Sequence, residues 1–123
     1  MAKPPPGTIL WHDLTVNDAS GMRDFYAAVV GWEPSAVDMG DYEDFTLRPK
    51  GGEGVAAICN ARGGSADMPK SWLCYVVVAS LQDSLATVNA LGGDVIVQPQ
   101  RLGKGKFAVI KDPQGGVIAL YQV

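Results

Sequence analysis

The chain has 123 residues, of which 47% are hydrophobic and 19% are charged, a balance typical of a folded globular domain. A formal net charge of −3 offers no basic face for nucleic acid, and no apolar run is long enough to span a bilayer. The two cysteines have no metal-binding spacing, and a reduced cytoplasmic compartment is the simplest interpretation. We therefore expect a cytoplasmic protein that has neither nucleic acid nor a membrane as a partner.

The first half of the chain predicts a strand, a helix and three further strands. Thr8–Val16 is rich in β-forming residues and ends at Asn17 and Asp18, which are good helix N-caps. Apolar side chains then recur at helical spacing until Gly31, which ends the helix. They are Met22, Phe25, Tyr26, Val29 and Val30. The three strands that follow are expected at Glu33–Met39, Phe45–Arg48 and Val55–Asn60.

The second half repeats this plan after a linker at residues 61–71 that is rich in Gly and Ser. Trp72–Ala79 is expected to be a strand, and the capping-box pattern from Ser80 to Asp83 begins a helix that Gly92 and Gly93 end. Asp112-Pro113-Gln114-Gly115 suits a type I turn. The remaining strands are expected at Val95–Val97, Phe107–Lys111 and Val117–Gln122.

A shift of the sequence by 62 positions aligns the two halves without a gap. It aligns Val16 with Val78, Gly31 with Gly93, Phe45 with Phe107, and Ala57 with Ala119. We therefore predict one α+β domain made of two βαβββ repeats, residues 8–60 and 71–123, joined by the linker. The eight strands would form a curved mixed sheet around a cavity that holds a small molecule.

The duplicated βαβββ plan carries motifs that resemble the vicinal-oxygen-chelate superfamily, which includes glyoxalase I, bleomycin-resistance proteins and extradiol dioxygenases. The motifs are Leu14-Thr15-Val16-Asn17-Asp18, Phe25-Tyr26, Gly31-Trp32 and Asp112-Pro113-Gln114-Gly115. The run Phe107–Gly115 with Ile118–Gln122 after it is most similar to the glyoxalase-like branch. The resemblance covers nearly the whole chain and implies a glyoxalase-like fold.

The resemblance also implies where a divalent metal would be held, on the first and last strands of each half. Those four positions are Trp11 and Leu73, and Ala57 and Ala119. None of these side chains has a lone pair to donate to a metal ion. His12 is the only histidine, and the two-residue period of a strand turns it away from Trp11. We therefore expect no metal ligands and no cofactor.

The same period selects the side chains that would face the cavity. The predicted ligand-binding residues are Trp11, Asp13, Phe45, Cys59, Tyr75, Phe107 and Tyr121. Most are aromatic with a few polar tips, as in small-molecule pockets; the alternative is that these rings fill the space as core. Asp13 is the candidate catalytic acid or base, or else a structural acceptor for Tyr75 or a backbone N–H.

The function predicted from these features is the binding of a small, aromatic organic molecule without a conventional metal site. One alternative is an enzyme, a glyoxalase-type lyase or isomerase or a dioxygenase-like protein, with a relocated metal or a mechanism based on Asp13. Another is a homodimeric interaction module whose cavity is vestigial. The resemblance implies a homodimer for each of these three functions.

Overall fold

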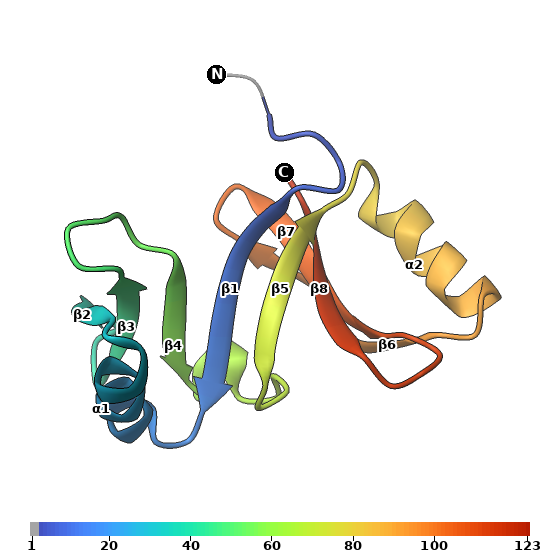
Figure 1. Cartoon of the computed structure of the whole chain (residues 1–123). Coiled ribbons are helices and arrows are strands. Elements are labelled where there is room, and N and C mark those ends of the chain that lie inside the picture. The colour runs from blue at the N-terminus through green and yellow to red at the C-terminus, as the bar shows by residue number, and fades with distance from the viewer. Residues whose placement is uncertain (1–2) are drawn as a thin grey trace. The chain divides into compact units, whose positions relative to one another are not determined.

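A computed structural model describes residues 3–123, and in this part of the chain two α-helices and eight strands follow one another in the predicted order (Figure 1). The strands are β1 (Ile9–Val16), β2 (Glu33–Asp38), β3 (Glu43–Arg48), β4 (Ala56–Asn60), β5 (Trp72–Val77), β6 (Asp94–Leu102), β7 (Gly105–Lys111) and β8 (Val117–Gln122). The helices are α1 (Ala19–Val30) and α2 (Leu81–Ala90), and a short 3-10 helix covers Gly63–Ser65. No helix of residues 3–123 has both the length and the apolarity to cross a membrane.

The chain divides into two compact units. His12–Trp72 forms the first unit, and Leu73–Val123 with the N-terminal residues through Trp11 forms the second. Hydrogen-bonded neighbours in the first unit follow the order β2-β3-β4-β1, and in the second the order β5-β8-β7-β6. The start of β1 belongs to the second unit, where the Val77 N–H donates to the Thr8 carbonyl. Each unit is therefore a βαβββ module, and the chain is of the α+β class.

The helices begin and end at the residues expected from the sequence. Asp18 caps α1 by accepting from the Gly21 N–H, and Ser80 caps α2 by accepting from the Asp83 N–H. Gly31 ends α1 in the left-handed conformation, at φ 86°. The most buried helical residues are Ala19 and Leu81, which correspond in the repeat. Both helices therefore pack against their sheets with the corresponding face.

The strand that pairs in parallel with its neighbour also keeps the repeat. Asp13 lies opposite Ala57 in β1 and β4, and Tyr75 lies opposite Ala119 in β5 and β8. All four positions correspond under the shift of the sequence. The other pairings within each unit are antiparallel, so each sheet is mixed.

The third strand of each unit breaks the repeat by one residue. Phe45 pairs with Ile58, whereas Phe107 pairs with Tyr121, the repeat partner of Cys59 rather than of Ile58. A slip of one residue turns every side chain of a strand to the other face of the sheet. The aromatic rings of Phe45 and Phe107 therefore lie on opposite faces of their respective sheets.

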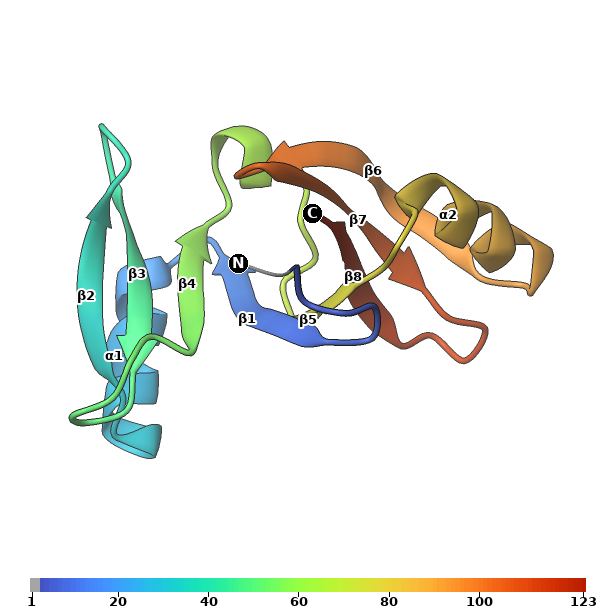
Figure 2. The ribbon, with the colours of Figure 1, turned by 90° about the horizontal axis from the view of Figure 1, so that it is seen from above.

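Each helix covers one face of its own sheet, here called the helix side, and the other face is called the far side (Figure 2). The helix-side core of the first unit contains aromatic and aliphatic residues: Leu14, Ala19, Phe45, Leu47, Ala56 and Ile58, with Tyr26, Trp32 and Trp72 packed against them. The helix-side core of the second unit is aliphatic: Leu81, Ala108 and Leu120, with Val78, Leu85, Ile110 and Ile118.

Candidate ligand-binding site

An aromatic cavity lies in the second unit. Its volume is about 470 Å³, and it is lined by Leu10, Trp11, Tyr75, Leu102, Gly103 and Tyr121. Tyr75 is only 3% exposed, whereas Trp11 and Tyr121 are half-buried and Leu10 and Leu102 are exposed. The cavity therefore has an aromatic lining and an apolar rim, which suits a planar organic molecule of drug-like size.

Phe107 supports the cavity from beside Tyr75. The centroids of the two rings lie 5.8 Å apart with their planes inclined by 54°. Both side chains are on the far side of the sheet, because Phe107 pairs with Tyr121 and Tyr75 pairs with Ala119. Phe107 is 7% exposed and does not line the cavity itself, so its contribution is to hold the Tyr75 ring.

The turn between β6 and β7 closes one edge of the cavity. The Tyr121 hydroxyl donates to the carbonyl oxygen of Leu102 at 3.0 Å, which ties β8 to this turn. Gly105 makes the approach feasible: a Cβ there would overlap the Gln122 carbonyl oxygen and lie 2.6 Å from the Tyr121 hydroxyl oxygen. Gly103 adopts a φ of 60°, a conformation that favours glycine.

The far side of the first unit is polar where that of the second is aromatic. Asp13 and Ala57 pair with each other, and Thr46 pairs with Ala57 from the next strand. Cys59 lies beside Thr15 in the same parallel ladder. The structure therefore places the predicted residues Asp13 and Cys59 on one face, within the first unit.

Cys59 is held as a neutral thiol. Burial raises its pKa to about 12, and the negative charges of Asp13 and Asp44 act in the same direction. A thiol with this pKa has almost no thiolate at neutral pH, so it is a poor nucleophile. Its role is that of a small half-buried side chain.

Phe45 does not lie where the sequence predicts. It is 5% exposed and packs in the helix-side core of the first unit, and the guanidinium carbon of Arg23 lies 4.7 Å from its ring centroid. The cause is the register of β3, which pairs Phe45 with Ile58. The expectation that Phe45 faces the same side as Asp13 and Cys59 is wrong.

His12 lies on the helix side of the first unit, as the strand period predicts. It lines a separate cavity of about 470 Å³ together with Trp32, Val55, Ala56 and Trp72. The Trp72 indole N–H donates to the Tyr26 hydroxyl at 3.0 Å, which links this cavity wall to α1.

The structure thus brings three of the predicted residues into one cavity, Trp11, Tyr75 and Tyr121, with Phe107 behind them. Sequence reasoning missed the rim residues Leu10, Leu102 and Gly103. The glycine-rich stretch at 103–106 indicates a hairpin turn, and the structure confirms the turn. The available signal was this glycine-rich stretch itself, because a turn there places Leu102 and Gly103 at the tip of a hairpin.

The family follows from the sequence as a whole. Residues 8–120 match the model of the Glyoxalase/Bleomycin resistance protein/Dioxygenase superfamily. The chain belongs to this superfamily, as its motifs predict, and the paired βαβββ modules agree with that assignment.

Among its relatives, the anthracycline biosynthesis protein DauV of Streptomyces sp. (strain C5) is 30% identical over 135 aligned residues. The alignment covers 99% of this chain and 49% of DauV. The putative glyoxylase CFP32 of Mycobacterium tuberculosis is 29% identical, with 93% of this chain and 43% of the relative covered. The chain therefore spans about half the length of the curated relatives that it matches.

Solved structures share the fold at low sequence identity. A superfamily member from Vibrio splendidus 12B01 has a TM-score of 0.58 at 15% identity, covering 92% of this chain and 97% of that one. The Mn(II)-bound glyoxalase from Novosphingobium aromaticivorans has a TM-score of 0.56 at 20% identity, covering 95% and 39%. These likenesses concern the fold alone.

The side chains at the positions where the family holds a metal do not fit a metal ion. Trp11, Leu73, Ala57 and Ala119 offer no lone pair. In the structure, Ala57 and Ala119 lie opposite Asp13 and Tyr75, so each methyl group is on the far side of its sheet. Among residues 3–123, no group of three or more His, Cys, Asp or Glu side chains is arranged to hold a metal ion.

Proposed function

We propose that this chain binds a planar aromatic organic molecule in the cavity lined by Trp11, Tyr75 and Tyr121, without a metal ion at the family positions. The observation that carries the proposal is the convergence of three aromatic side chains on one cavity of about 470 Å³. Stacked or edge-to-face ring pairs contribute about 0.5–1.5 kcal/mol beyond the buried area. Three such rings favour a flat ring system over an aliphatic chain.

Two further observations support a polycyclic, acidic ligand. Relatives of 29–30% identity are named as anthracycline biosynthesis proteins, and anthracyclines are flat polycyclic aromatic compounds. Arg101 and Lys104 flank the rim residues Leu102 and Gly103 in the sequence. Their side chains line a separate groove with Lys106, so their positive charge favours a phenolate, carboxylate or sulfonate on the ring through long-range attraction rather than by contact.

The proposal is tested by calorimetry of the whole chain with anthraquinone sulfonate, after dialysis against a chelator. We expect saturable binding that the chelator leaves unchanged. Trp11→Ala should weaken it about tenfold, equivalent to about 1.4 kcal/mol. Phe25→Ala is the matched control, because Phe25 is 52% exposed on α1 and lies outside the cavity. Methanesulfonate, which has the charge without the ring, should not bind.

Two results would contradict this function. Equal weakening by Trp11→Ala and Phe25→Ala would mean that the cavity is not the site. Stoichiometric zinc, nickel, manganese or iron in the purified protein, required for binding, would overturn the metal-free part of the proposal.

Turnover that depends on Asp13 is the second candidate function. Asp13 is half-buried beside the polar residues of the first unit, and its charge acts on the Cys59 thiol. A relative is named a putative glyoxylase. Asp13→Asn should abolish isomerisation of the methylglyoxal–glutathione adduct to lactoylglutathione if this candidate holds. No lactoylglutathione formed by the unmodified chain would eliminate it.

A further inference from the structure

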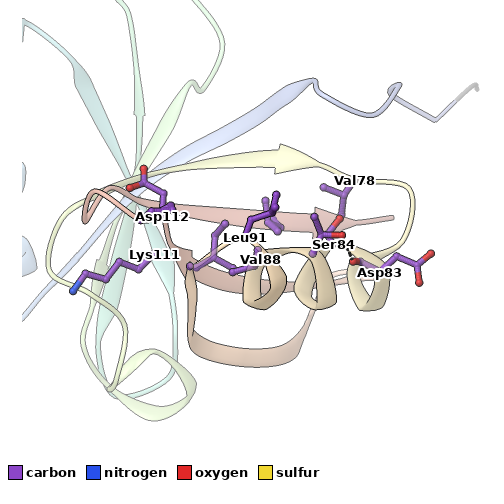
Figure 3. Close-up of a pocket in the computed structure, with 12 residues that line it drawn as sticks. Val78, Asp83, Ser84, Val88, Leu91, Lys111 and Asp112 are labelled. Carbon is purple, nitrogen blue, oxygen red and sulfur yellow. Dashed lines mark hydrogen bonds between the residues drawn. The ribbon is translucent and has the colours of Figure 1, made fainter.

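A second cavity lies on the helix side of the second unit, between α2 and the sheet (Figure 3). Its volume is about 450 Å³. It is distinct from the aromatic cavity, because Leu120 lines this one and the next residue of β8, Tyr121, lines the other. The lining residues are Val78, Asp83, Ser84, Thr87, Val88, Leu91, Gly93, Ile110, Lys111, Asp112, Pro113 and Leu120. We call this space the α2 cavity.

Comparison with the first unit explains why space remains between α2 and its sheet. At the helix positions that correspond in the repeat, α1 has Met22 and Tyr26, which pack against the core, whereas α2 has Ser84 and Val88. The sheet also presents a smaller side chain to α2 than to α1. Ile58 and Leu120 correspond in the repeat, but Phe45 lies opposite Ile58 whereas Ala108 lies opposite Leu120.

Three large side chains of the first unit thus correspond to three small ones in the second. Protein interiors are close-packed, and voids much larger than a water molecule are few. The missing volume here leaves a cleft that opens to solvent, because Thr87, Leu91 and Pro113 in its lining are exposed. An open, mainly apolar cleft of this size is a feature that a ligand occupies. Leu91, which is 72% exposed at one end of the cavity, would lose contact with water when a ligand is bound.

The charged side chains around the α2 cavity do not turn toward its interior. Figure 3 shows the Asp83 carboxylate and the Lys111 ammonium directed outward at opposite ends. The carboxylate of Asp112 already accepts hydrogen bonds from the Gln114 and Gly116 N–H groups. A charged ligand would lose hydration here without gaining an ionic partner.

The uncharged polar side chains that line the α2 cavity carry hydroxyls, the exposed Thr87 and the half-buried Ser84. The Thr87 hydroxyl donates to the Asp83 carbonyl at 3.0 Å, within α2 itself. Ser84 lies among aliphatic side chains, including Val88 and Ile110. We propose that the α2 cavity is a second ligand site, which takes an uncharged, mainly aliphatic small molecule with one group that hydrogen-bonds to Ser84.

The test uses methyl-resolved NMR of the whole chain with three probes of similar size: cyclohexanol, cyclohexylammonium and cyclohexanecarboxylate. We expect cyclohexanol to shift the methyl signals of Val88, Ile110 and Leu120 saturably, and the charged probes to bind at least tenfold more weakly. Shifts that do not saturate, or equal binding of a charged probe, would overturn the proposal.

Two matched variants test whether filling the α2 cavity blocks binding. Ser84→Met places at this position the side chain that α1 has, and should weaken cyclohexanol binding at least tenfold. Gln82→Met adds the same side chain at an exposed position of α2 outside the cavity, and should not. If Ser84→Met fails to fold, Val88→Leu provides a milder filling. Cyclohexanol binding that survives both filling variants would contradict the assignment.

Two additional measurements distinguish this proposal from the proposed function and from self-association of the chain. Binding of anthraquinone sulfonate should be the same in Ser84→Met as in the unmodified chain, so failure at one cavity does not imply failure at the other. Sedimentation should show no self-association that Ser84→Met abolishes. Such self-association would mean that a second copy of the chain covers the α2 cavity, and the small-molecule proposal would be wrong.

Discussion

The two halves of this chain place their aromatic side chains on opposite faces of a common design. In the first unit the rings of Tyr26, Phe45 and Trp32 belong to the helix-side core, and the far side has Asp13 and Cys59. In the second unit the helix side is aliphatic, and aromatic residues line the cavity on the far side. One duplicated module therefore yields an aromatic helix-side core in one unit and an aromatic far-side cavity in the other.

The register of a single strand explains one part of this difference, the opposite faces of Phe45 and Phe107. The other part is residue type, because Asp13 and Cys59 correspond in the repeat to Tyr75 and Tyr121. The turn between β7 and β8 is tight, and its Asp112 N–H donates to the Gly116 carbonyl. The corresponding loop of the first unit is longer, and its Val55 N–H donates to the Leu47 carbonyl. Turn geometry sets hairpin register, so this loop is sufficient to turn Phe45 away from the face that Phe107 occupies.

The largest expected effect separates the two phenylalanines. Phe45→Ala and Phe107→Ala should each lower the free energy of unfolding by about 3–5 kcal/mol, because both rings are buried. Only Phe107→Ala should also weaken binding of anthraquinone sulfonate, since Tyr75 loses its ring contact. Urea denaturation and calorimetry measure the two effects. Equal weakening of binding by both variants would contradict the register difference.

A smaller effect is expected at the turn that closes the aromatic cavity. Gly105→Ala should lower stability by about 1–3 kcal/mol and weaken ligand binding, because its Cβ would displace Tyr121 or the backbone of β8. Gly52→Ala is the control in the loop between β3 and β4 of the first unit, where a Cβ would meet the Pro49 side chain at 3.2 Å. Unfolding midpoints and affinities that match in the two variants would contradict the role given to Gly105.

The polar far side of the first unit predicts a dependence on alkaline pH. The pKa of Cys59 is raised to about 12, above that of a thiol in the unfolded chain, so unfolding releases a proton. The contribution of Cys59 is present below about pH 9 and is lost as pH rises toward 12, by at most ~1.4 kcal/mol per pH unit. Denaturation from pH 8 to about pH 11 should therefore show a shallower loss in Cys59→Ala. Parallel curves would argue against a buried neutral thiol.

The smallest effects come from two single hydrogen bonds, one in each unit. Tyr121→Phe removes the bond to the Leu102 carbonyl, and Tyr26→Phe removes the bond from the Trp72 indole N–H. Each should cost about 0.5–1.5 kcal/mol of stability by thermal unfolding. Tyr121→Phe should also lower affinity for anthraquinone sulfonate slightly, whereas Tyr26→Phe should not. The reverse order of affinities would place the ligand in the first unit.

The features that could be predicted from sequence are those set by local chemistry. Asp18, Gly31 and Ser80 locate helix ends because a cap is a contact between near neighbours. The faces of Asp13 and Tyr75 follow from alternation along strands whose pairing keeps the repeat. The strand predicted at Val95–Val97 is longer in the structure, where β6 continues through Pro99 to Leu102. Proline is tolerated there because β6 is an edge strand, where a missing N–H breaks no ladder hydrogen bond.

Longer-range features could not be predicted in this way. The face of Phe45 depends on the register of β3 against β4, and a gapless alignment of the two halves gives no sign of a slip in pairing. The α2 cavity depends on the absence of volume at Ser84, Val88 and Ala108, which becomes meaningful only beside Met22, Tyr26 and Phe45. Packing between elements determines both features.

The central claim is tested most directly by NMR contacts between anthraquinone sulfonate and the chelator-treated chain. We expect intermolecular contacts from the ligand protons to the rings of Trp11, Tyr75 and Tyr121, with no metal ion added. Contacts confined to other residues, or contacts that appear only when a divalent metal is restored, would contradict it.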